Sequence, residues 1–339
     1  MALTNHRWVL KRRPQGEIKQ GDLDYVSEPV RDLAEGEVLI RNIYLSLDPT
    51  NRIWMSDMDQ YMPPVEVGAA MRGGVIGVVE ASRSDRFKPG DIASPGLGAW
   101  ESYTIGHESL TRAMTPPPGV PLTALMSVLG GTGLTAYFGT MFIGEPKPGE
   151  TMVVSAAAGA VGSIAGQIGK IKGARVIGIA GGPAKCAWLT EELGFDGAID
   201  YKNEDVGAAL DRLCPNGIDV NFENVGGEIM DAVFSRMNNF GRMILCGMIS
   251  GYNSEGVMPG PSDFSRILMR RLLVKGFIVT DYLPRAGEAM AEMGPWVMSG
   301  RIKWKAHVVD GLENALDALG RLFTGDHDGK LLVRVSPEA

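Results

Sequence analysis

The run of small residues from Ala156 to Gly162 is the stretch of this sequence best suited to chemistry. An apolar, β-branched segment at 151–155 leads into it, and a helix-compatible segment at 163–170 follows it. This order predicts a strand, a tight turn and a helix, and a second apolar run at 175–180 stands at the spacing of a βαβ unit. The amide groups that open such a helix favour a phosphate above the edge of the sheet.

The glycine spacing in this turn approximates a dinucleotide-binding fingerprint. Gly159 would let the backbone approach a pyrophosphate closely, and Gly162 would let the helix pack against its strand. Ala157 stands at the first glycine position, so the pattern is A-x-G-x-x-G. Small residues at a βα turn also serve simple close packing, and the motif alone leaves that alternative open.

The end of the second predicted strand indicates which dinucleotide would bind. An NAD-binding fold usually places Asp or Glu about 20 residues after the glycines, to hold the ribose hydroxyls. This chain has no carboxylate between Gly162 and Glu191, but it has Lys185, which would attract a 2′-phosphate. The hydroxyl of Tyr201, after the third strand, could contact the same phosphate. The sequence therefore favours NADPH over NADH, and the alternative for Lys185 is an ordinary solvated lysine.

Strands and helices alternate from residue 125 onward, which predicts a doubly wound parallel sheet of six strands. Ligands of such sheets bind beyond the carboxyl ends of the strands. The predicted strands are 151–155, 175–180, 197–200, 218–223, 242–247 and 272–279, and the predicted helices lie near 205–213, 228–238, 263–271 and 285–299.

Residues before this sheet have the short, β-rich segments of an all-β module. Strands are predicted at 7–11, 37–44, 74–80 and 100–105. The segment at 47–64 is too irregular for a core strand and is expected to form a loop, either over a cleft or in simple packing. The tail returns to β character at 305–309 and 330–335 around a helix from Leu312. We expect an α/β protein with a discontinuous domain of residues 1–124 and 304–339 and a second domain of residues 125–303.

Composition and charge narrow the class of protein. The chain has 339 residues, of which 45% are apolar and 22% charged, and its net charge of −7 argues against a nucleic-acid partner. No run of about 20 apolar residues predicts a membrane span, and the first residues lack the apolar core of a signal peptide. Three irregularly spaced cysteines indicate neither a disulfide framework nor a metal cluster. We expect a cytoplasmic protein.

Several longer motifs resemble the medium-chain dehydrogenase/reductase superfamily. The resemblance is greatest to its zinc-free branch of prostaglandin reductases and alkenal or enone double-bond reductases, and within it to bacterial curcumin reductase-like proteins. It covers nearly the whole chain and implies a GroES-like β domain, a Rossmann domain and a homodimer formed through the edge of the Rossmann sheet. The motifs are 47–52, 133–137, 156–162, 223–227, 246–253 and 325–330.

The same resemblance implies which residues contact NADP(H). His327 stands where the family usually has Asn, although a neutral imidazole could still hydrogen-bond the cofactor. Thr50 stands where plant and animal members commonly have Tyr, which predicts a difference in how the substrate is gripped. The implied contacts are Gly159, Ala160, Val161, Gly162, Lys185, Tyr201, Asn224, Cys246, Gly247, Ile249, Ser250, Tyr252, Phe277, Ile278, Val279 and His327.

No metal site is expected from the sequence. His107, in the triplet 106–108, resembles part of the zinc-ligand motif of alcohol dehydrogenases. In those enzymes the motif opens the segment that corresponds to 71–79 here, and this segment contains no histidine. A catalytic zinc needs three protein ligands, and the first cysteine of the chain is Cys186.

These features together predict NADPH-dependent reduction of the C=C bond of α,β-unsaturated ketones and aldehydes, with hydride added to the β-carbon and a proton to the α-carbon. Charge that builds on the substrate carbonyl needs a hydrogen-bond donor. Tyr252, beyond the fifth strand, is the candidate, because a tyrosine is ordinarily protonated at neutral pH. Its alternative role is to hold the cofactor. Apolar residues that could line the substrate site, or simply pack the core, are Trp54, Met55, Tyr61, Met62 and Tyr282.

Two other functions remain open. A zinc-free NADPH quinone reductase of the same superfamily would also act on conjugated carbonyls. A non-enzymatic NADPH-binding sensor would bind the cofactor without turnover. Rates on an alkenal, a dienone and a quinone would separate these readings.

Overall fold

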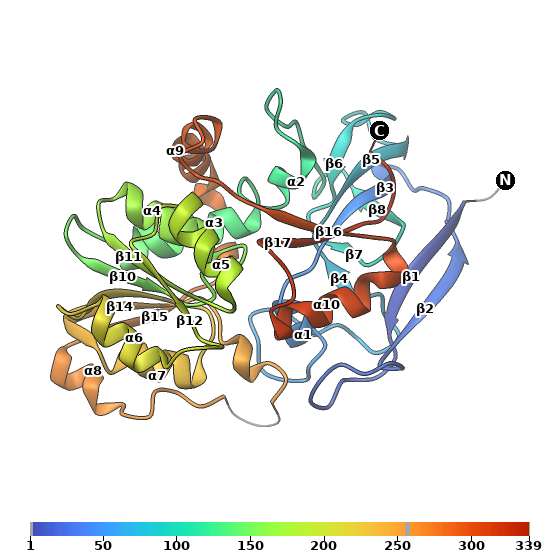
Figure 1. Cartoon of the computed structure of the whole chain (residues 1–339). Helices are drawn as coiled ribbons and strands as arrows, with labels where there is room; N and C mark the ends of the chain where they lie inside the picture. Colours follow the sequence, from blue (N-terminus) through green and yellow to red (C-terminus); the bar gives the residue numbers. More distant parts are fainter. Residues whose placement is uncertain (1–2, 255–257, 339) are drawn as a thin grey trace. The chain divides into compact units, whose positions relative to one another are not determined.

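The computed structural model describes residues 3–254 and 258–338 and contains two compact units (Figure 1). Unit 1 consists of Met1–Met126 and Ala306–Ala339, and unit 2 consists of Ser127–Lys305. Three residues at the ends of these spans, Met1, Ala2 and Ala339, lie outside the described residues. That unit 1 is the substrate domain and unit 2 the cofactor domain remains a prediction.

Unit 2 contains a parallel six-stranded sheet with the strand order β12-β11-β10-β13-β14-β15. The predicted doubly wound sheet is therefore confirmed. Its central strands β10 and β13 are largely buried because helices cover both faces, although β13 includes the buried polar residues Asn221 and Glu223. The strands are β10 (Thr151–Val154), β11 (Arg175–Ala180), β12 (Gly197–Asp200), β13 (Ile218–Glu223), β14 (Met237–Leu245) and β15 (Leu273–Gly276).

Helices α3 and α4 lie on one face of this sheet and helices α6 and α7 on the other (Figure 1). Single turns of π-helix at Thr140–Gly144 and Trp188–Glu192, and 3-10 turns at Ile249–Gly251 and Val279–Arg285, connect the regular elements. The helices are α3 (Gly131–Gly139), α4 (Gly162–Ile171), α5 (Pro183–Ala187), α6 (Val206–Leu213), α7 (Gly227–Phe234), α8 (Ser265–Arg270) and α9 (Ala286–Met298).

Several predicted boundaries in unit 2 were wrong. The strand expected at 242–247 begins at Met237 and ends at Leu245. The helix expected at 228–238 ends at Phe234, because the chain turns and Met237 already pairs with Ile218 at the start of β14. The strand expected at 272–279 ends at Gly276, and a 3-10 turn begins at Val279. Phe277, Ile278 and Val279 continue the apolar run beyond the last residue of β15 that pairs with β14, so this strand was predicted too long.

Unit 1 contains a seven-stranded sheet with the order β16-β17-β3-β5-β6-β9, in which β8 also pairs with β3. Strand β17 pairs antiparallel with β3 at Leu332 and Ser46, so the tail of the chain completes this sheet. The strands are β1 (Thr4–Leu10), β2 (Leu23–Pro29), β3 (Glu37–Ser46), β4 (Arg72–Gly73), β5 (Val75–Ser82), β6 (Ile92–Ser94), β7 (Gly98–Ala99), β8 (Tyr103–His107), β9 (Arg112–Ala113), β16 (Ala306–Asp310) and β17 (Lys330–Arg334), and the helices are α1 (Thr50–Trp54), α2 (Leu122–Leu125) and α10 (Ala315–Thr324).

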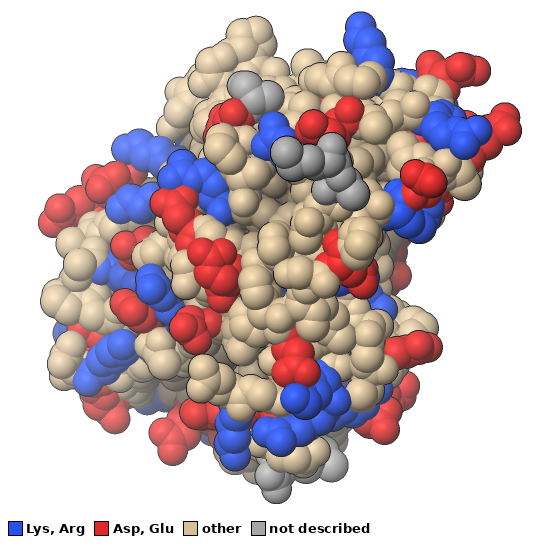
Figure 2. All heavy atoms as spheres, turned by 90° about the vertical axis from the view of Figure 1, so that its right-hand side faces the viewer, with Lys and Arg blue, Asp and Glu red and all other residues tan. Residues whose placement is uncertain are grey.

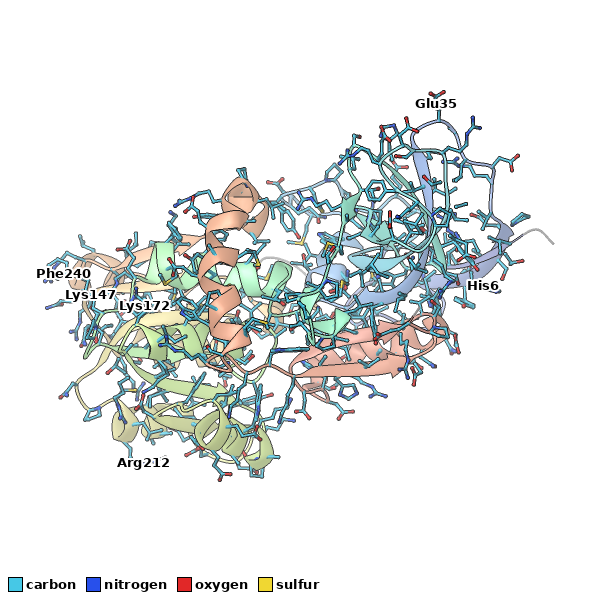
Figure 3. The ribbon with its side chains drawn as sticks, turned by 90° about the horizontal axis from the view of Figure 1, so that it is seen from above. His6, Glu35, Lys147, Lys172, Arg212 and Phe240 are labelled. Carbon is cyan, nitrogen blue, oxygen red and sulfur yellow. The ribbon has the colours of Figure 1, made fainter. Side chains whose placement is uncertain are left out.

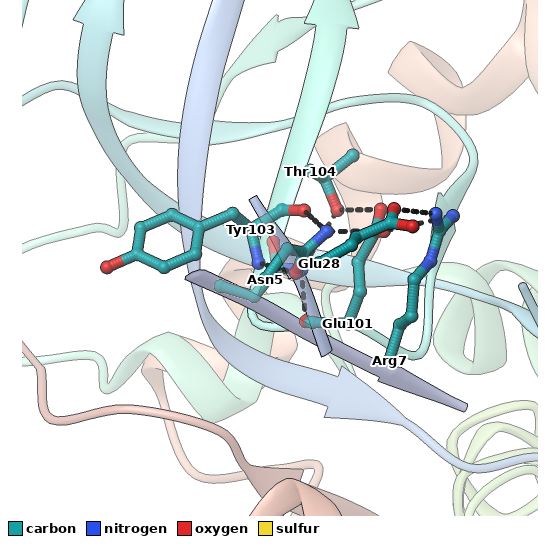
Figure 4. A network of polar contacts seen from close by, with 7 residues as sticks. Asn5, Arg7, Glu28, Glu101, Tyr103 and Thr104 are labelled. Carbon is teal, nitrogen blue, oxygen red and sulfur yellow. Dashed lines mark hydrogen bonds and ion pairs between the residues drawn. The ribbon is translucent and has the colours of Figure 1, made fainter. Parts of the chain in front are cut away.

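A buried polar cluster also holds unit 1 together (Figure 4). The carboxyl group of Glu101, which is 7% exposed, accepts hydrogen bonds from the Asn5 amide and from the Thr104 hydroxyl, each at 3.0 Å. Arg7 lies 3.5 Å from the same carboxyl group and also pairs with Glu28. The cluster joins β1 to β8, two strands far apart in sequence.

The loop expected at 47–64 was only partly correct, because helix α1 forms within it. Met55, directly after α1, is completely buried and packs with Leu45, Trp100 and Leu331 in the main core of unit 1. The sequence pattern also missed β2, whose charged and polar residues pair only with β1 and remain largely exposed.

Acidic and basic side chains are interspersed over the face shown in Figure 2, and neither sign dominates there. Among the described residues, no helix combines the length and apolarity required to cross a bilayer.

Candidate functional site

The turn after β10 has the close packing that the glycine pattern predicts. A Cβ on Gly162 would lie 2.5 Å from the carbonyl oxygen of Ala156, so no other residue fits there without moving the backbone. At Gly159 the corresponding distance to the same oxygen is 3.1 Å. Ala160 and Val161 lie between the two glycines, and α4 begins immediately after them. The first amides of α4 are therefore held beside the end of β10, a position suited to a phosphate.

Positively charged and hydroxyl groups meet at the carboxyl ends of β11 and β12. Lys185 lies on α5, directly after β11, and Tyr201 follows β12. A Cβ on Gly181 would lie 3.0 Å from the Tyr201 hydroxyl and 2.9 Å from the ε-carbon of Lys202. Because Gly181 has no side chain, both the Tyr201 ring and the Lys202 side chain can lie against it. Lys202 is a cation that was not predicted as part of the site.

A carboxylate outside the stretch between Gly162 and Glu191 also lies at this end of the sheet. Asp200, at the end of β12, accepts hydrogen bonds at Oδ1 from the backbone N–H of Gly182 at 2.7 Å and of Lys202 at 3.1 Å, and at Oδ2 from Asn203 Nδ2 at 2.7 Å. Despite the opposing effect of burial, these donors keep the pKa of Asp200 below its usual range. Both Asp200 oxygens are therefore already engaged by neighbouring donors.

Asn224 connects the end of β13 to the turn after β10. Its side-chain amide donates to the carbonyl oxygen of Ser155 at 2.7 Å, and its backbone N–H donates to the Ser155 hydroxyl at 2.8 Å. Two of the loops that carry predicted cofactor contacts are thereby fixed to each other.

The loop from Cys246 to Tyr252 is fixed in turn to the loop after β13. The N–H of Ile249 donates to the Asn224 carbonyl at 3.1 Å, and the Ser250 hydroxyl donates to the Val225 carbonyl at 2.6 Å. The Tyr252 hydroxyl accepts a hydrogen bond from the N–H of Met248 at 3.1 Å, and a Cβ on Gly247 would lie 3.2 Å from that hydroxyl. Tyr252 therefore closes its own loop.

The thiol of Cys246 is not a reactive group. Burial, together with the Glu223 carboxylate, raises its pKa to about 12. The thiolate is the nucleophilic form of cysteine, so this shift disfavours a reactive Cys246 at neutral pH, and its contact with the cofactor remains a prediction.

Phe277, Ile278 and Val279 follow the edge strand β15 and lead into an aromatic cluster. Gly139 makes room for Phe277, because a Cβ there would lie 2.9 Å from its ring. The ring of Tyr282 stacks on Phe138 at 4.9 Å between centroids and meets Phe277 edge-on at 6.1 Å. Tyr282 is therefore part of this cluster.

The proposed substrate contacts around α1, in unit 1, differ in how deeply they are buried. Of the two alternatives for Met55, the structure supports core packing, since Met55 is completely buried, and Trp54 is only 9% exposed. Tyr61 is 44% exposed, yet its hydroxyl accepts a hydrogen bond from Trp54 Nε1 at 2.8 Å and lies 2.8 Å from the Thr50 hydroxyl. Thr50 thus contacts a tyrosine located further along the chain.

His327 is placed in unit 1, where its Nδ1 lies 3.2 Å from the carbonyl oxygen of Arg321 at the end of α10. Its contact with the cofactor remains a prediction. His107 lies 2.8 Å from the Ser109 hydroxyl. Within the described ranges, no group of three His, Cys, Asp or Glu side chains is arranged to hold a metal ion.

Two family models match this chain. The model described as the N-terminal domain of oxidoreductase matches residues 6–113, and the model described as zinc-binding dehydrogenase matches residues 160–296.

Similar proteins cover almost the full length of the chain. The NADPH-dependent curcumin reductase of Escherichia coli is 41% identical over 98% of this chain and 97% of its own. The NADP(+)-dependent 2-alkenal reductase of Nicotiana tabacum is 37% identical over 99% of both chains. The crystal structure of CurA from Vibrio vulnificus in complex with NADPH superposes with a TM-score of 0.93 and 41% identity, over 98% of this chain and 100% of that one.

Proposed function

Because the chain belongs to the medium-chain dehydrogenase/reductase superfamily, in its branch of alkenal and enone double-bond reductases, we propose that it reduces the C=C bond of α,β-unsaturated ketones and aldehydes with NADPH. The membership rests on relatives that are 37–41% identical over nearly the whole chain. Their names describe NADPH- or NADP(+)-dependent reductases, and the chain is accordingly an NADP(H)-dependent oxidoreductase.

The observation that carries the cofactor assignment is the combination of a glycine-lined phosphate turn with cations after β11 and β12. Gly162 leaves no space for a side chain, which matches the close packing of the helix against its strand, and Gly159 leaves the backbone open where the fingerprint brings a pyrophosphate close. Lys185, Tyr201 and Lys202 supply charge and a hydroxyl where a 2′-phosphate would be recognised. The chain's own residues therefore fit the phosphorylated dinucleotide.

NADPH supplies a hydride for the β-carbon of the substrate when it is bound. The electron pair of the C=C bond moves toward the carbonyl group, the α-carbon takes up a proton, and the olefin gains two hydrogens in total. Stabilisation of the charge on the carbonyl oxygen is the task of this chain's hydrogen-bond donors. We assign this role to the Tyr252 O–H, which is held on its loop by the Met248 N–H.

Tyr61 and Tyr282 are the remaining candidates for contact with the substrate. Tyr61 combines an exposed ring with an anchored hydroxyl, and Tyr282 belongs to a cluster of aromatic rings. Flat, conjugated carbonyl compounds suit such surfaces, because aromatic rings stack on extended π-systems.

We also propose that the protein is a homodimer formed through β15. Within the described residues this strand pairs only with β14, which leaves its other edge open, and open edges pair with further strands. Beside it, Leu268 is 72% exposed and Met269 is 65% exposed. A second copy would cover these apolar side chains. Zinc independence and a cytoplasmic location remain predictions.

The decisive experiment is a screen of an enal, a dienone such as curcumin and a quinone for NADPH consumption, with identification of the product. Saturation of the C=C bond of the enal or dienone is expected. Faster turnover of the quinone would indicate a quinone reductase, and NADPH binding without turnover of any activated alkene would indicate a sensor.

A further inference from the structure

One buried carboxyl group connects the loops that follow β10, β13 and β14. Glu223, the last residue of β13, has no exposed surface. Its Oε1 accepts three hydrogen bonds, from the Ser155 hydroxyl at 2.9 Å, from the Val225 N–H at 2.7 Å and from the Gly226 N–H at 2.8 Å. A single oxygen atom thus fixes the turn after β10 to the loop after β13.

The backbone of Glu223 makes the connection to the third loop. Its carbonyl oxygen accepts the N–H groups of Cys246 at 2.9 Å and of Gly247 at 3.1 Å. Predicted cofactor contacts lie on all three loops: Gly159–Gly162, Asn224 and Cys246–Tyr252. A change in the position of Glu223 would therefore move all of them.

The second carboxyl oxygen faces another buried side chain. Oε2 accepts a hydrogen bond from Asn221 Nδ2 at 3.0 Å, and Asn221 is also fully buried. Asn221 Oδ1 has no hydrogen-bond partner among the described residues. If the Asn221 amide turned over, this oxygen could accept a hydrogen bond from an amide at position 223. A glutamine there can therefore keep the same number of hydrogen bonds as the glutamate.

Stability alone does not explain a carboxyl group at this position. Within the part of the chain that the structure describes, no Lys, Arg or His pairs with Glu223. Burial raises its pKa, although its four hydrogen-bond donors oppose that shift. Burying an ionisable group without a counter-ion costs free energy that an apolar residue would not. What the carboxyl group adds is a defined geometry for the turn after β10 and the loop after β13.

We propose that Glu223 is a positioning residue of the cofactor site: its carboxyl group fixes the turn after β10 to the loop after β13, on which the loop after β14 rests through the Glu223 backbone carbonyl, and the carboxyl group does not itself touch the cofactor. The inference rests on the proposed function and deepens it, because it assigns cofactor affinity to a residue below the site.

The test compares NADPH dissociation constants, measured by fluorescence titration, for the wild type and the variants Glu223→Gln, Glu223→Leu and Ser155→Ala. Glu223→Gln should bind within about threefold of the wild type, since its amide oxygen can take over the three donors on Oε1. Glu223→Leu leaves these donors unpaired and should bind roughly ten- to a hundredfold more weakly. Ser155→Ala removes one donor and should weaken binding roughly fivefold; it provides the answer if Glu223→Leu does not fold.

Glu101→Leu is the matched control, because Glu101 is a buried, hydrogen-bonded glutamate of unit 1 (Figure 4). It should lower the melting temperature without changing the affinity for NADPH. The proposal is overturned if Ser155→Ala and Glu223→Leu bind NADPH like the wild type, or if Glu223→Gln binds as weakly as Glu223→Leu. A wild-type protein that does not bind NADPH would refute the proposed function instead.

Discussion

At Gly178, a missing side chain explains why the first glycine of the fingerprint can be an alanine. Ala157 is completely buried, and a Cβ on Gly178 would lie 2.9 Å from the Ala157 methyl group. There is space for a methyl group at only one of these two positions. With alanine at position 157, the residue that must be glycine is Gly178 in β11. A motif defined only on the residues of the turn does not include this position.

Lys185 and Lys202 should distinguish the two nicotinamide cofactors. Replacing either lysine by alanine should raise the KM for NADPH by roughly ten- to a hundredfold, the loss expected for a charge-assisted contact, and should leave the KM for NADH nearly unchanged. Lys172, at the opposite end of α4 and labelled in Figure 3, is the matched control. Equal losses with both cofactors would contradict a role in binding the 2′-phosphate.

Tyr252→Phe separates the two roles of that hydroxyl. If the O–H stabilises charge in the transition state, kcat should fall roughly a hundredfold or more while NADPH affinity changes little. If the hydroxyl only closes the loop through the Met248 N–H, the affinity for NADPH should fall instead. Stopped-flow hydride transfer and a binding titration on the same variant provide both values.

At the scale of elements, the contact between the phosphate turn and α4 depends on Gly162. Gly162→Ala would place a methyl group 2.5 Å from the Ala156 carbonyl oxygen and should destabilise the fold by about 1–3 kcal/mol. Gly320, inside α10, has open space around its missing Cβ, since no neighbouring side chain or other segment lies within 4 Å of it. Gly320→Ala should therefore be neutral or stabilise by up to about 1 kcal/mol. Urea unfolding of both variants measures the difference, and similar values for the two would contradict the steric argument.

Elements with buried faces were the ones that the sequence predicted best. The strands at 175–180, 197–200 and 218–223 were correct to the residue, since each has buried apolar residues bounded by turn residues. Strand β2 was missed because Leu23–Pro29 mixes apolar residues with Asp24, Ser27 and Glu28 and ends in a proline. Helix α1 was missed because five residues after a proline show no helical period.

Parts of the candidate site could not be predicted because they depend on contacts across the sheet. Glu223 stands at the end of a strand, where a carboxylate is usually solvated, and only the fold shows that Ser155 and two backbone amides enclose it. Lys202 could have been identified, because it follows Tyr201 at the same strand end. The carboxylate of Asp200 was not predicted at this site because it lies at the end of the next strand, outside the stretch between Gly162 and Glu191.

At the scale of the whole molecule, the acid–base behaviour of buried carboxyl groups sets part of the pH dependence of stability. Burial raises the pKa of Glu101 in the folded protein, and Arg7, Asn5 and Thr104 only partly oppose it. The folded state therefore favours the protonated form, and this contribution is present at low pH and is lost as pH rises through the folded pKa. The stability of Glu101→Gln relative to the wild type should accordingly increase from pH 4.5 to pH 8.

The pKa of Glu37 is shifted in the opposite direction to that of Glu101. Hydrogen bonds from Arg31 and the Ala34 N–H lower its pKa to about 2. Glu37→Gln should lose stability at neutral pH, and the loss should disappear as pH falls from about 4.5 toward 2. Chemical denaturation of both variants across this range checks the two signs, and parallel pH profiles would contradict the assignment.

The oligomeric state gives a further test at this scale. Leu268→Asp should halve the mass measured by light scattering if β15 and α8 form the interface, because a buried, unpaired carboxylate opposes association. Leu110→Asp is the control, since Leu110 is 68% exposed in unit 1. A wild type that is already monomeric, or a Leu268→Asp variant that remains dimeric, would contradict this interface.

The tail strand β17, which lies beside β3, has a consequence for biosynthesis. Residues 127–305 form an uninterrupted unit and can fold as soon as they leave the ribosome. The first 126 residues cannot complete their sheet until residues 306–334 have been translated. Until then β3 has an unpaired edge along Tyr44–Ser46, and such an edge can recruit a strand from another nascent chain. The rate at which the final segment is synthesised therefore sets how long each new molecule is exposed to aggregation.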